Sequence, residues 1–473
     1  MAPTINFAGL ASGIDSNALI DAVNAAAKKS RVEPKQTRVT ELQDTNDAFS
    51  TLKEKMNELK DLLDDFRTIN GGGLQKLGQA ADETIARASA TGLASNGTYT
   101  VEVTQLAKNA NASFDDRFAS DTSAINSNIN DGASASNRTV TVQIGTGTEM
   151  ETVSVVLTST TTWASFVQQF NSQATAATAS VVNVGTPSTP SYAVMINGAN
   201  TGTQQGQIAI SVGSEITGTI PPAMNARTIS QATDATFKVS GIASSTTITR
   251  STNEVTDVIP GVTLEMVAVG TTTVTIGDDA DATQTKVQEW VDAFNEIITF
   301  VNEQNRIQRE ESGANVANVF SPFARTSTDD NAVSSLRTSL SNSVYGDGSL
   351  VRIMSDLGIQ TQRDGTLKFD TEDFQEAVSE ESTSVNEVLM EFADTLASTN
   401  GVIDQFVGFN QLIDLAVRGN SDQITNLNRQ IADAEANIER NADALRARFA
   451  RLESLTARLQ QQQNSLLSAL STG

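Results

Sequence analysis

Apolar residues recur at seven-residue spacing in two long stretches, one near each end of the chain. In the first stretch the two seam positions of the heptad are filled in turn by Leu42, Thr45, Phe49, Leu52, Met56, Leu59, Leu63 and Phe66. Seven of these eight side chains are apolar, which predicts a helix of the coiled-coil type.

Local signals predict where helices of this N-terminal region begin and end. Asp15 is a candidate N-cap for a first helix with Leu19, Ile20 and Val23 on one face. Pro34 predicts a kink or break before the heptads start. The three glycines at 71–73 predict the end of the heptad helix and then act as a linker, since they lack the Lys and Ser/Thr of a phosphate-binding loop.

The second heptad stretch fills the last fifty residues. Its first seam position is apolar throughout, and its second is mixed with Ala, Asn, Arg and Gln. The apolar seam residues are Ile424, Leu427, Ile431, Ile438, Leu445, Leu452, Leu455, Leu459 and Leu466. A helix over 421–469 would be about 70 Å long at 1.5 Å per residue and needs a partner for its apolar stripe. We expect the two chain ends to pair with each other, with Met56 close to the region from Ile424 to Leu452.

Between residues 74 and 276 the pattern changes to short alternating runs separated by Gly, Asn, Ser and Thr, as in β-strands. One helix is expected there, at 163–171. From about residue 281, with Asp281 as N-cap, helices return. Residues 308–335 are polar and predict a loop. Residues 354–370 predict two strands joined by a type I′ turn at Asp364-Gly365.

These patterns predict an α+β multidomain fold, in which a helical coiled-coil stalk built from both chain termini carries two nested β-rich head domains. Terminal helical segments at 1–37 and 450–473 are expected to stay mobile until assembly. A helical leg domain takes 38–73 and 277–449, with the β-hairpin near 354–370. One β-rich head domain takes 74–112 and 232–276, and a second, nested one takes 113–231.

Composition removes most chemistry from consideration. The 473 residues include no Cys and no His, which excludes disulfides, thiolate or imidazole metal sites, and His-dependent nucleophilic catalysis. We therefore expect no enzyme activity, no cofactor and no metal. The formal charge of −24 argues against nucleic-acid binding. We expect the inserted domains to carry most of it.

The sequence has no run of about 18 uninterrupted apolar residues, so no membrane span is expected. Its first residues lack the basic start and apolar core of a cleaved signal peptide. If the protein leaves the cell, we expect it to do so without such a leader.

Five motifs resemble those of the flagellar hook-associated protein 2 family, whose members cap flagellar filaments. They are GLASGID at 9–15, GTYTVEVTQLA at 97–107, NEVTDVIPGVTL at 253–264, VDAFN at 291–295 and LGIQTQRDGTL at 357–367. The resemblance covers roughly residues 1–107 and 236–473, and its specificity comes from five motifs in the right order.

The resemblance implies a secreted protein at the distal tip of the flagellar filament. It implies a ring-shaped homo-oligomer, with a pentamer favoured, that promotes folding and insertion of exported flagellin and prevents its loss. Implied partners besides flagellin are the hook–filament junction proteins and a flagellar export chaperone. Three other hypotheses remain: a hook–filament junction protein, flagellin itself, and a surface adhesin that uses the Ser/Thr-rich β-head for cell adhesion.

Overall fold

The computed structural model describes residues 15–216, 224, 227–240, 246–312, 315–341 and 351–470. It divides into two compact units, one formed by residues 1–73 with 281–473 and the other by residues 74–280. The first unit is mainly helical and the second mainly β, so the predicted α+β class with helices from both termini is confirmed.

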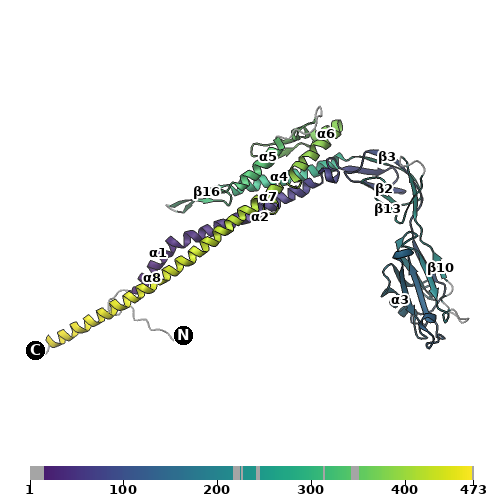
Figure 1. Ribbon diagram of the computed structural model, residues 1–473, viewed down its shortest axis with the longest axis horizontal. Helices are drawn as coiled ribbons and strands as arrows, with labels where there is room; N and C mark the ends of the chain where they lie inside the picture. The colour runs from purple at the N-terminus through teal and green to yellow at the C-terminus, as the bar shows by residue number, and fades with distance from the viewer. Residues whose placement is uncertain are drawn as a thin grey trace. The chain divides into compact units, whose positions relative to one another are not determined.

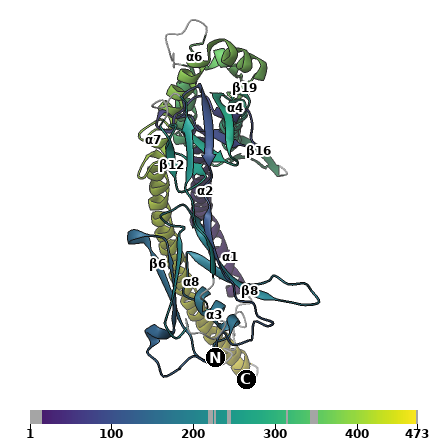
Figure 2. The ribbon, with the colours of Figure 1, turned by 90° about the vertical axis from the view of Figure 1, so that its right-hand side faces the viewer.

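The helical unit is built from both chain ends. Its helices are α1 (Ser16–Arg31), α2 (Glu33–Asp64), α4 (Ala280–Gln304), α5 (Thr328–Ser341), α6 (Thr371–Ala397), α7 (Asp404–Val407) and α8 (Leu412–Leu470). In Figure 1 the purple helices α1 and α2 run beside the yellow-green helix α8, and Figure 2 shows the same arrangement from another side.

The N-terminal helix signals act as expected. The Asp15 carboxylate accepts hydrogen bonds from the backbone N–H groups of Asn17 and Ala18, at 3.1 and 3.0 Å, and so caps α1. Pro34 is the second residue of α2, where its missing N–H has no intrahelical role, and the helices break at Val32. On α1 only Ile20 of the predicted apolar face is buried.

Helix α2 ends earlier than the glycines predict. It stops at Asp64, and a short 3₁₀ helix, η1 (Thr68–Asn70), follows before Gly71. The glycines are also more than a linker. Gly73 has a φ of +68°, and a Cβ there would lie 2.0 Å from the Asn386 side chain of α6. These positions require glycine because α6 packs directly on them.

The predicted loop at 308–335 is wrong. Strands β16 (Ile307–Ser312) and β17 (Asn315–Phe320) pair as an antiparallel hairpin, and α5 begins at Thr328. Polarity misled the interpretation, since a two-stranded ribbon needs apolar alternation only where one of its faces covers a core. Helix α4 also begins at Ala280, so Asp281 lies in its first turn and is not its N-cap.

The hairpin near 354–370 differs in two details from its prediction. Met354–Leu357 is a 3₁₀ helix, η4, and the strands are β18 (Ile359–Thr361) and β19 (Leu367–Phe369). Only Gly365 has a positive φ in the turn, whereas type I′ requires positive φ at two residues. The Gly365 N–H donates to the Gln362 carbonyl, so the turn is type I followed by a glycine bulge.

The described residues of the β unit form one five-stranded, one four-stranded and two three-stranded antiparallel sheets. Their orders are β1-β15-β3-β11-β12, β10-β4-β8-β7, β13-β14-β2 and β6-β5-β9. The strands are β1 (Lys76–Ala80), β2 (Ala86–Ala90), β3 (Gly97–Gln105), β4 (Asn109–Phe114), β5 (Thr139–Ile144), β6 (Glu151–Val156), β7 (Ala177–Asn183), β8 (Tyr192–Thr201), β9 (Ile208–Val212), β10 (Arg227–Ser230), β11 (Ala235–Val239), β12 (Ile248–Arg250), β13 (Glu254–Val255), β14 (Val262–Met266) and β15 (Gly270–Asp278).

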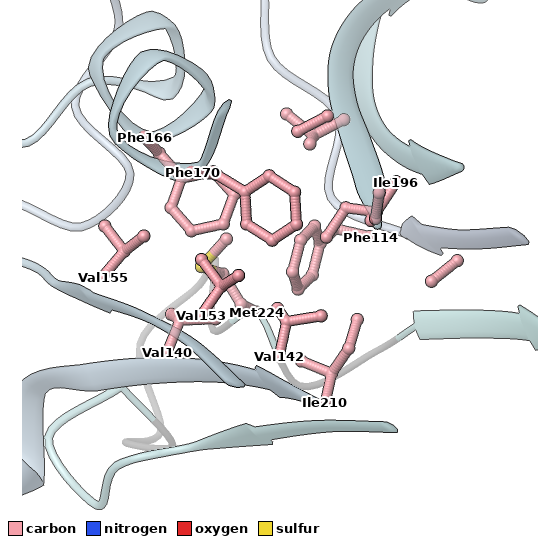
Figure 3. Packing of buried hydrophobic residues seen from close by; sticks show 14 of the residues in the cluster. Phe114, Val140, Val142, Val153, Val155, Phe166, Phe170, Ile196, Ile210 and Met224 are labelled. Atoms are coloured by element: carbon pink, nitrogen blue, oxygen red, sulfur yellow. The ribbon is translucent and has the colours of Figure 1, made fainter. Parts of the chain in front are cut away.

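Where the structure describes the β unit, its buried apolar residues form two hydrophobic clusters. One uses residues between Ala80 and Ala107 together with residues between Ala235 and Ile276. The other uses residues between Ala110 and Ala232 and includes α3 (Trp163–Asn171), the helix predicted there. Figure 3 shows Phe166 and Phe170 of α3 packed toward Phe114 of β4 and the valines of β5 and β6.

The distribution of charge differs from our expectation. Residues 74–280 hold 8 basic and 16 acidic side chains, whereas residues 281–423 hold 9 basic and 24 acidic ones. The acidic excess therefore lies mainly in the helical region that follows the β unit.

Candidate functional site: the heptad helices and the turns that hold them

The heptad row of α2 is completely covered. All eight seam side chains from Leu42 to Phe66 are at most 7% exposed. Elements from much later in the chain cover them. The Phe49 ring lies 5.0 Å from the ring of Phe323, and α2 contacts α6, α7 and α8. This row is therefore core of the helical unit and is unavailable to other proteins.

Helices α2 and α8 pair in an antiparallel register. The Asn420 side-chain amide donates to Asn46 Oδ1 at 2.9 Å, and Lys53 Nζ lies 2.6 Å from Asp414 Oδ1. Lys60 Nζ then pairs with Asp404 of α7 at 3.1 Å. The chain ends thus pair with each other, but the expected position of Met56 is wrong. It lies level with about residue 410, roughly 20 Å from Ile424 at 1.5 Å per residue.

The heptad row of α8 changes from half-buried to exposed along the helix. Ile424, Leu427, Ile431 and Leu445 are half-buried, and Ile438 is 4% exposed. The remaining predicted seam residues are Leu452, Leu455, Leu459 and Leu466, and they are 51–63% exposed, as is the neighbouring Leu467. We call these five leucines the distal row.

The change follows from the length of α1. Side chains of α1 from Asp21 to Lys28 line a groove with α8 side chains from Glu435 to Arg446. The described part of α1 begins at Ser16, level with about residue 450 of α8 at 1.5 Å per residue. Within the described residues, nothing covers the distal row. Its surroundings are basic, with Arg446, Arg448, Arg451 and Arg458 against a single Glu453.

A tandem motif fixes the start of α8. Residues 400–407 and 410–417 share the pattern N-x-x-I-D-x-x-V, and we call them the first and second turn modules. In each, the first Asn has a positive φ and its N–H donates to the Asp carboxylate, from Asn400 to Asp404 at 3.0 Å and from Asn410 to Asp414 at 3.1 Å.

Each turn module is also anchored to α2. The shared Ile is buried, and the shared Asp pairs with Lys60 in the first module and with Lys53 in the second, one heptad apart on α2. The Asn400 N–H and then Lys60 hold the pKa of Asp404 below its usual value. Lys53 foremost, together with the Asn410 N–H, does the same for the pKa of Asp414. Both carboxylates are therefore charged at neutral pH, and α8 starts at a fixed point on α2.

Two asparagines join sequence motifs that are far apart in the chain. Asn295 of α4 donates to the Leu367 carbonyl at 2.9 Å and accepts from the Leu367 N–H at 2.6 Å. In the β unit, Asn253 makes the equivalent pair with Ala107, at 3.0 and 2.7 Å. Each side-chain amide acts like a strand partner for one residue. The motifs quoted above thus meet in pairs, VDAFN with LGIQTQRDGTL and NEVTDVIPGVTL with GTYTVEVTQLA.

Neither the turn modules nor the asparagine pairs were anticipated from the sequence. The module repeat is visible at a ten-residue offset, but it carries four identical positions only and overlaps a helix boundary. Among the described residues, no helix is long and apolar enough to cross a membrane, and no cluster of acidic side chains is arranged to hold a metal ion.

Comparison with known families decides the relationship. A family model described as the N-terminus of flagellar hook-associated protein 2 matches residues 12–110, and one described as its C-terminus matches residues 232–461. The chain belongs to the flagellar hook-associated protein 2 family. The unmatched residues between the two models, 111–231, coincide with the cluster that contains α3.

Relatives of the family resemble the chain along its whole length. The A-type flagellar hook-associated protein 2 of Pseudomonas aeruginosa is 26% identical over 493 aligned positions, covering 100% of this chain and 98% of the relative. The flagellar hook-associated protein 2 of Xenorhabdus nematophila is 23% identical, with 99% of both chains covered. The crystal structure of domains D1–D2–D3 of the flagellar cap protein FliD from Escherichia coli has the same fold. It matches with a TM-score of 0.57 and 19% identity, over 79% of this chain and 99% of that one.

Proposed function

We propose that the protein is a flagellar filament cap, a ring-shaped homo-oligomer at the distal tip of the filament. In this role it promotes folding and insertion of exported flagellin subunits and prevents their loss to the medium. We favour a pentameric ring. The role is structural and needs no catalytic group or cofactor.

The observation that carries this proposal is membership of a family whose models match both ends of the chain. The distal row supports it, since exposed leucines at heptad spacing bury themselves when helices assemble. We propose that the heptad row of α8 from Leu452 onward forms contacts between subunits of the cap. The first heptad row, from Leu42 to Phe66, instead supports the leg from within.

We also propose that the protein is exported to the flagellum. A flagellar export chaperone would shield the C-terminal heptads before export, because a bare apolar row is an aggregation hazard. The hook–filament junction proteins would hold the first cap before any filament exists.

A deletion strain of the source bacterium tests the function. We expect hooks without filaments and monomeric flagellin in the culture medium, with filaments restored by a plasmid copy of the gene. Normal filaments in the deletion strain would reject the cap proposal. A deletion strain with filaments but with reduced attachment to surfaces would favour the adhesin. Electron micrographs that locate the protein at the hook–filament joint would favour the junction protein.

A second experiment tests the distal row. The change Leu455→Asp with Leu459→Asp should abolish the ring in light scattering and leave the melting temperature of the monomer unchanged, because both side chains are already exposed there. Ile69→Asp is the matched control, since Ile69 is also exposed on the helical unit and lies outside the row. A full ring in the double variant would reject a role for these leucines.

A further inference from the structure

An exposed apolar patch lies at the start of α8. Phe409 is 86% exposed, and Leu412 and Leu415 follow it at three-residue spacing with 44% and 54% exposure. We call these three side chains the Phe409 patch. Monomeric proteins rarely expose a Phe side chain to this extent, because its burial lowers the free energy by several times RT.

The turn modules provide an internal control for this patch. Thr399 precedes the first module as Phe409 precedes the second, and Gln405 stands in the first module where Leu415 stands in the second; Thr399 and Gln405 are both exposed. The first module makes the same positive-φ turn, the same Asn-to-Asp hydrogen bond and the same lysine pair. Phe409 and Leu415 are therefore not needed to form the turn, and their apolar character requires another explanation.

The patch is held in place. The Asn410 N–H is bound by Asp414, the Asn410 side-chain oxygen accepts from Arg418, and the buried Ile413 anchors the module. An aromatic side chain on a fixed turn has few torsions left to order, so binding costs it little conformational entropy.

Area and symmetry limit what can occupy the patch. A fully exposed large aromatic offers about 150–250 Å², so the three side chains together offer roughly 300 Å². A stable interface needs about 800 Å² on each partner. In addition, contact between this patch and the same patch of a second subunit is a two-fold contact. Such a contact gives dimers and cannot build a closed ring of more than two subunits. A small apolar anchor of this kind fits a partner that binds and leaves.

We propose that the Phe409 patch binds the apolar face of an amphipathic helix in an incoming flagellin subunit during its insertion. This inference rests on the proposed cap function and names three residues of the helical unit as the site that contacts flagellin. An amphipathic helix presents an apolar stripe of side chains, and such a stripe can bury the exposed parts of Phe409, Leu412 and Leu415. Repeated rounds of insertion require contacts that form and break, as a patch of this size allows.

Photocrosslinking identifies the occupant directly. The full-length protein with p-benzoylphenylalanine in place of Phe409 is produced in the deletion strain and irradiated during filament growth. We expect a crosslinked product that contains flagellin, and none when the probe replaces Ile69. A product that contains a second copy of this chain, or no product at Phe409, would overturn the proposal.

The second test transplants the first turn module into the second. We expect Phe409→Thr with Leu415→Gln to keep the melting temperature and ring mass of the parent, to shorten filaments at least threefold, and to raise monomeric flagellin in the medium. Ile69→Thr should grow filaments of normal length. Normal filaments from the double variant, or a loss of ring mass, would refute the assignment. Failure of the cap function itself would be recognised separately, by normal filaments in the deletion strain.

Discussion

The two heptad rows have the same seven-residue spacing of apolar residues, but their side chains differ greatly in solvent exposure. Met56 of α2 is fully buried, whereas Leu459 of α8 is 57% exposed. Part of the difference is in the row itself, since the second seam position of α8 includes Ala, Asn, Arg and Gln, and part is in what the rest of the chain supplies. Elements α6, α7 and α8 cover α2, and α1 covers only the middle of α8. A heptad pattern therefore predicts an apolar stripe and leaves open whether the same chain or another one covers it.

The test with the largest expected effect on stability replaces one leucine in each row by alanine. Leu52→Ala should lower the free energy of unfolding of the helical unit by about 2–5 kcal/mol, because a fully buried side chain leaves a cavity. Leu459→Ala should change it by less than about 0.5 kcal/mol in the monomer. Urea unfolding followed by Trp290 fluorescence, in a Trp163→Phe background, measures both. Equal effects would mean that the rows are equally covered in solution.

Loss of the asparagine hydrogen bonds should have the next largest effect on stability. One such asparagine lies in each unit, Asn295 in the helical unit and Asn253 in the β unit. Asn295→Ala leaves the N–H and carbonyl of Leu367 without their partner, which should cost the helical unit about 1–3 kcal/mol. Asn253→Ala should cost the β unit a similar amount through Ala107. Asn302→Ala is the control, since its single bond to Asp364 is long, at 3.4 Å, and exposed. Unfolding monitored at Trp290 or at Trp163 separates the units, and an effect of each change on the wrong unit would contradict the assignment.

The comparison also shows how far sequence reasoning reaches. The helices at both ends, the β-rich character of residues 74–276 and α3 follow from periodicity, because side-chain burial repeats with the period of the element. The register of α2 on α8 did not follow, since it depends on Lys53, Lys60 and the two turn modules, which are specific polar contacts without periodic signal. The sequence did not point to Phe409 either. A single apolar residue is not a signal by itself, and Phe409 becomes informative only when the folded turn shows that Thr399 occupies the equivalent position.

A smaller effect concerns the β unit and depends on pH. Burial, with Asp115 nearby and Arg117 in opposition, raises the pKa of Asp116 to about 6. One of its carboxyl oxygens has no hydrogen-bond partner among the described residues. The folded protein thus binds a proton that the unfolded chain has released, so stability falls as pH rises from about 4 to 6 and stays lower above that.

Asp116→Asn removes this charge and should remove the pH dependence. We expect the free energy of unfolding of the β unit at pH 7 to rise by about 1 kcal/mol, a value reduced for the partial exposure of the group. Urea unfolding followed by Trp163, in a Trp290→Phe background at pH 4 and 7, measures the change. Asp121→Asn serves as an exposed control. An unchanged slope between pH 4 and 6 in Asp116→Asn would show that another group is responsible.

The smallest expected effect tests the link between the turn modules and α2. Asp414→Asn weakens the pair with Lys53 and should cost about 0.2–1 kcal/mol, because the pair is partly exposed. The pKa of Asp414 is lowered in the folded state, so this stabilisation is present above pH 4 and is lost as pH falls through the lowered value. Asp404→Asn should behave alike through Lys60, and the double variant should show additive losses, since the two modules anchor α8 independently. Strongly non-additive losses would mean that the modules act as one unit, and that α8 has a single point of attachment where the repeat indicates two.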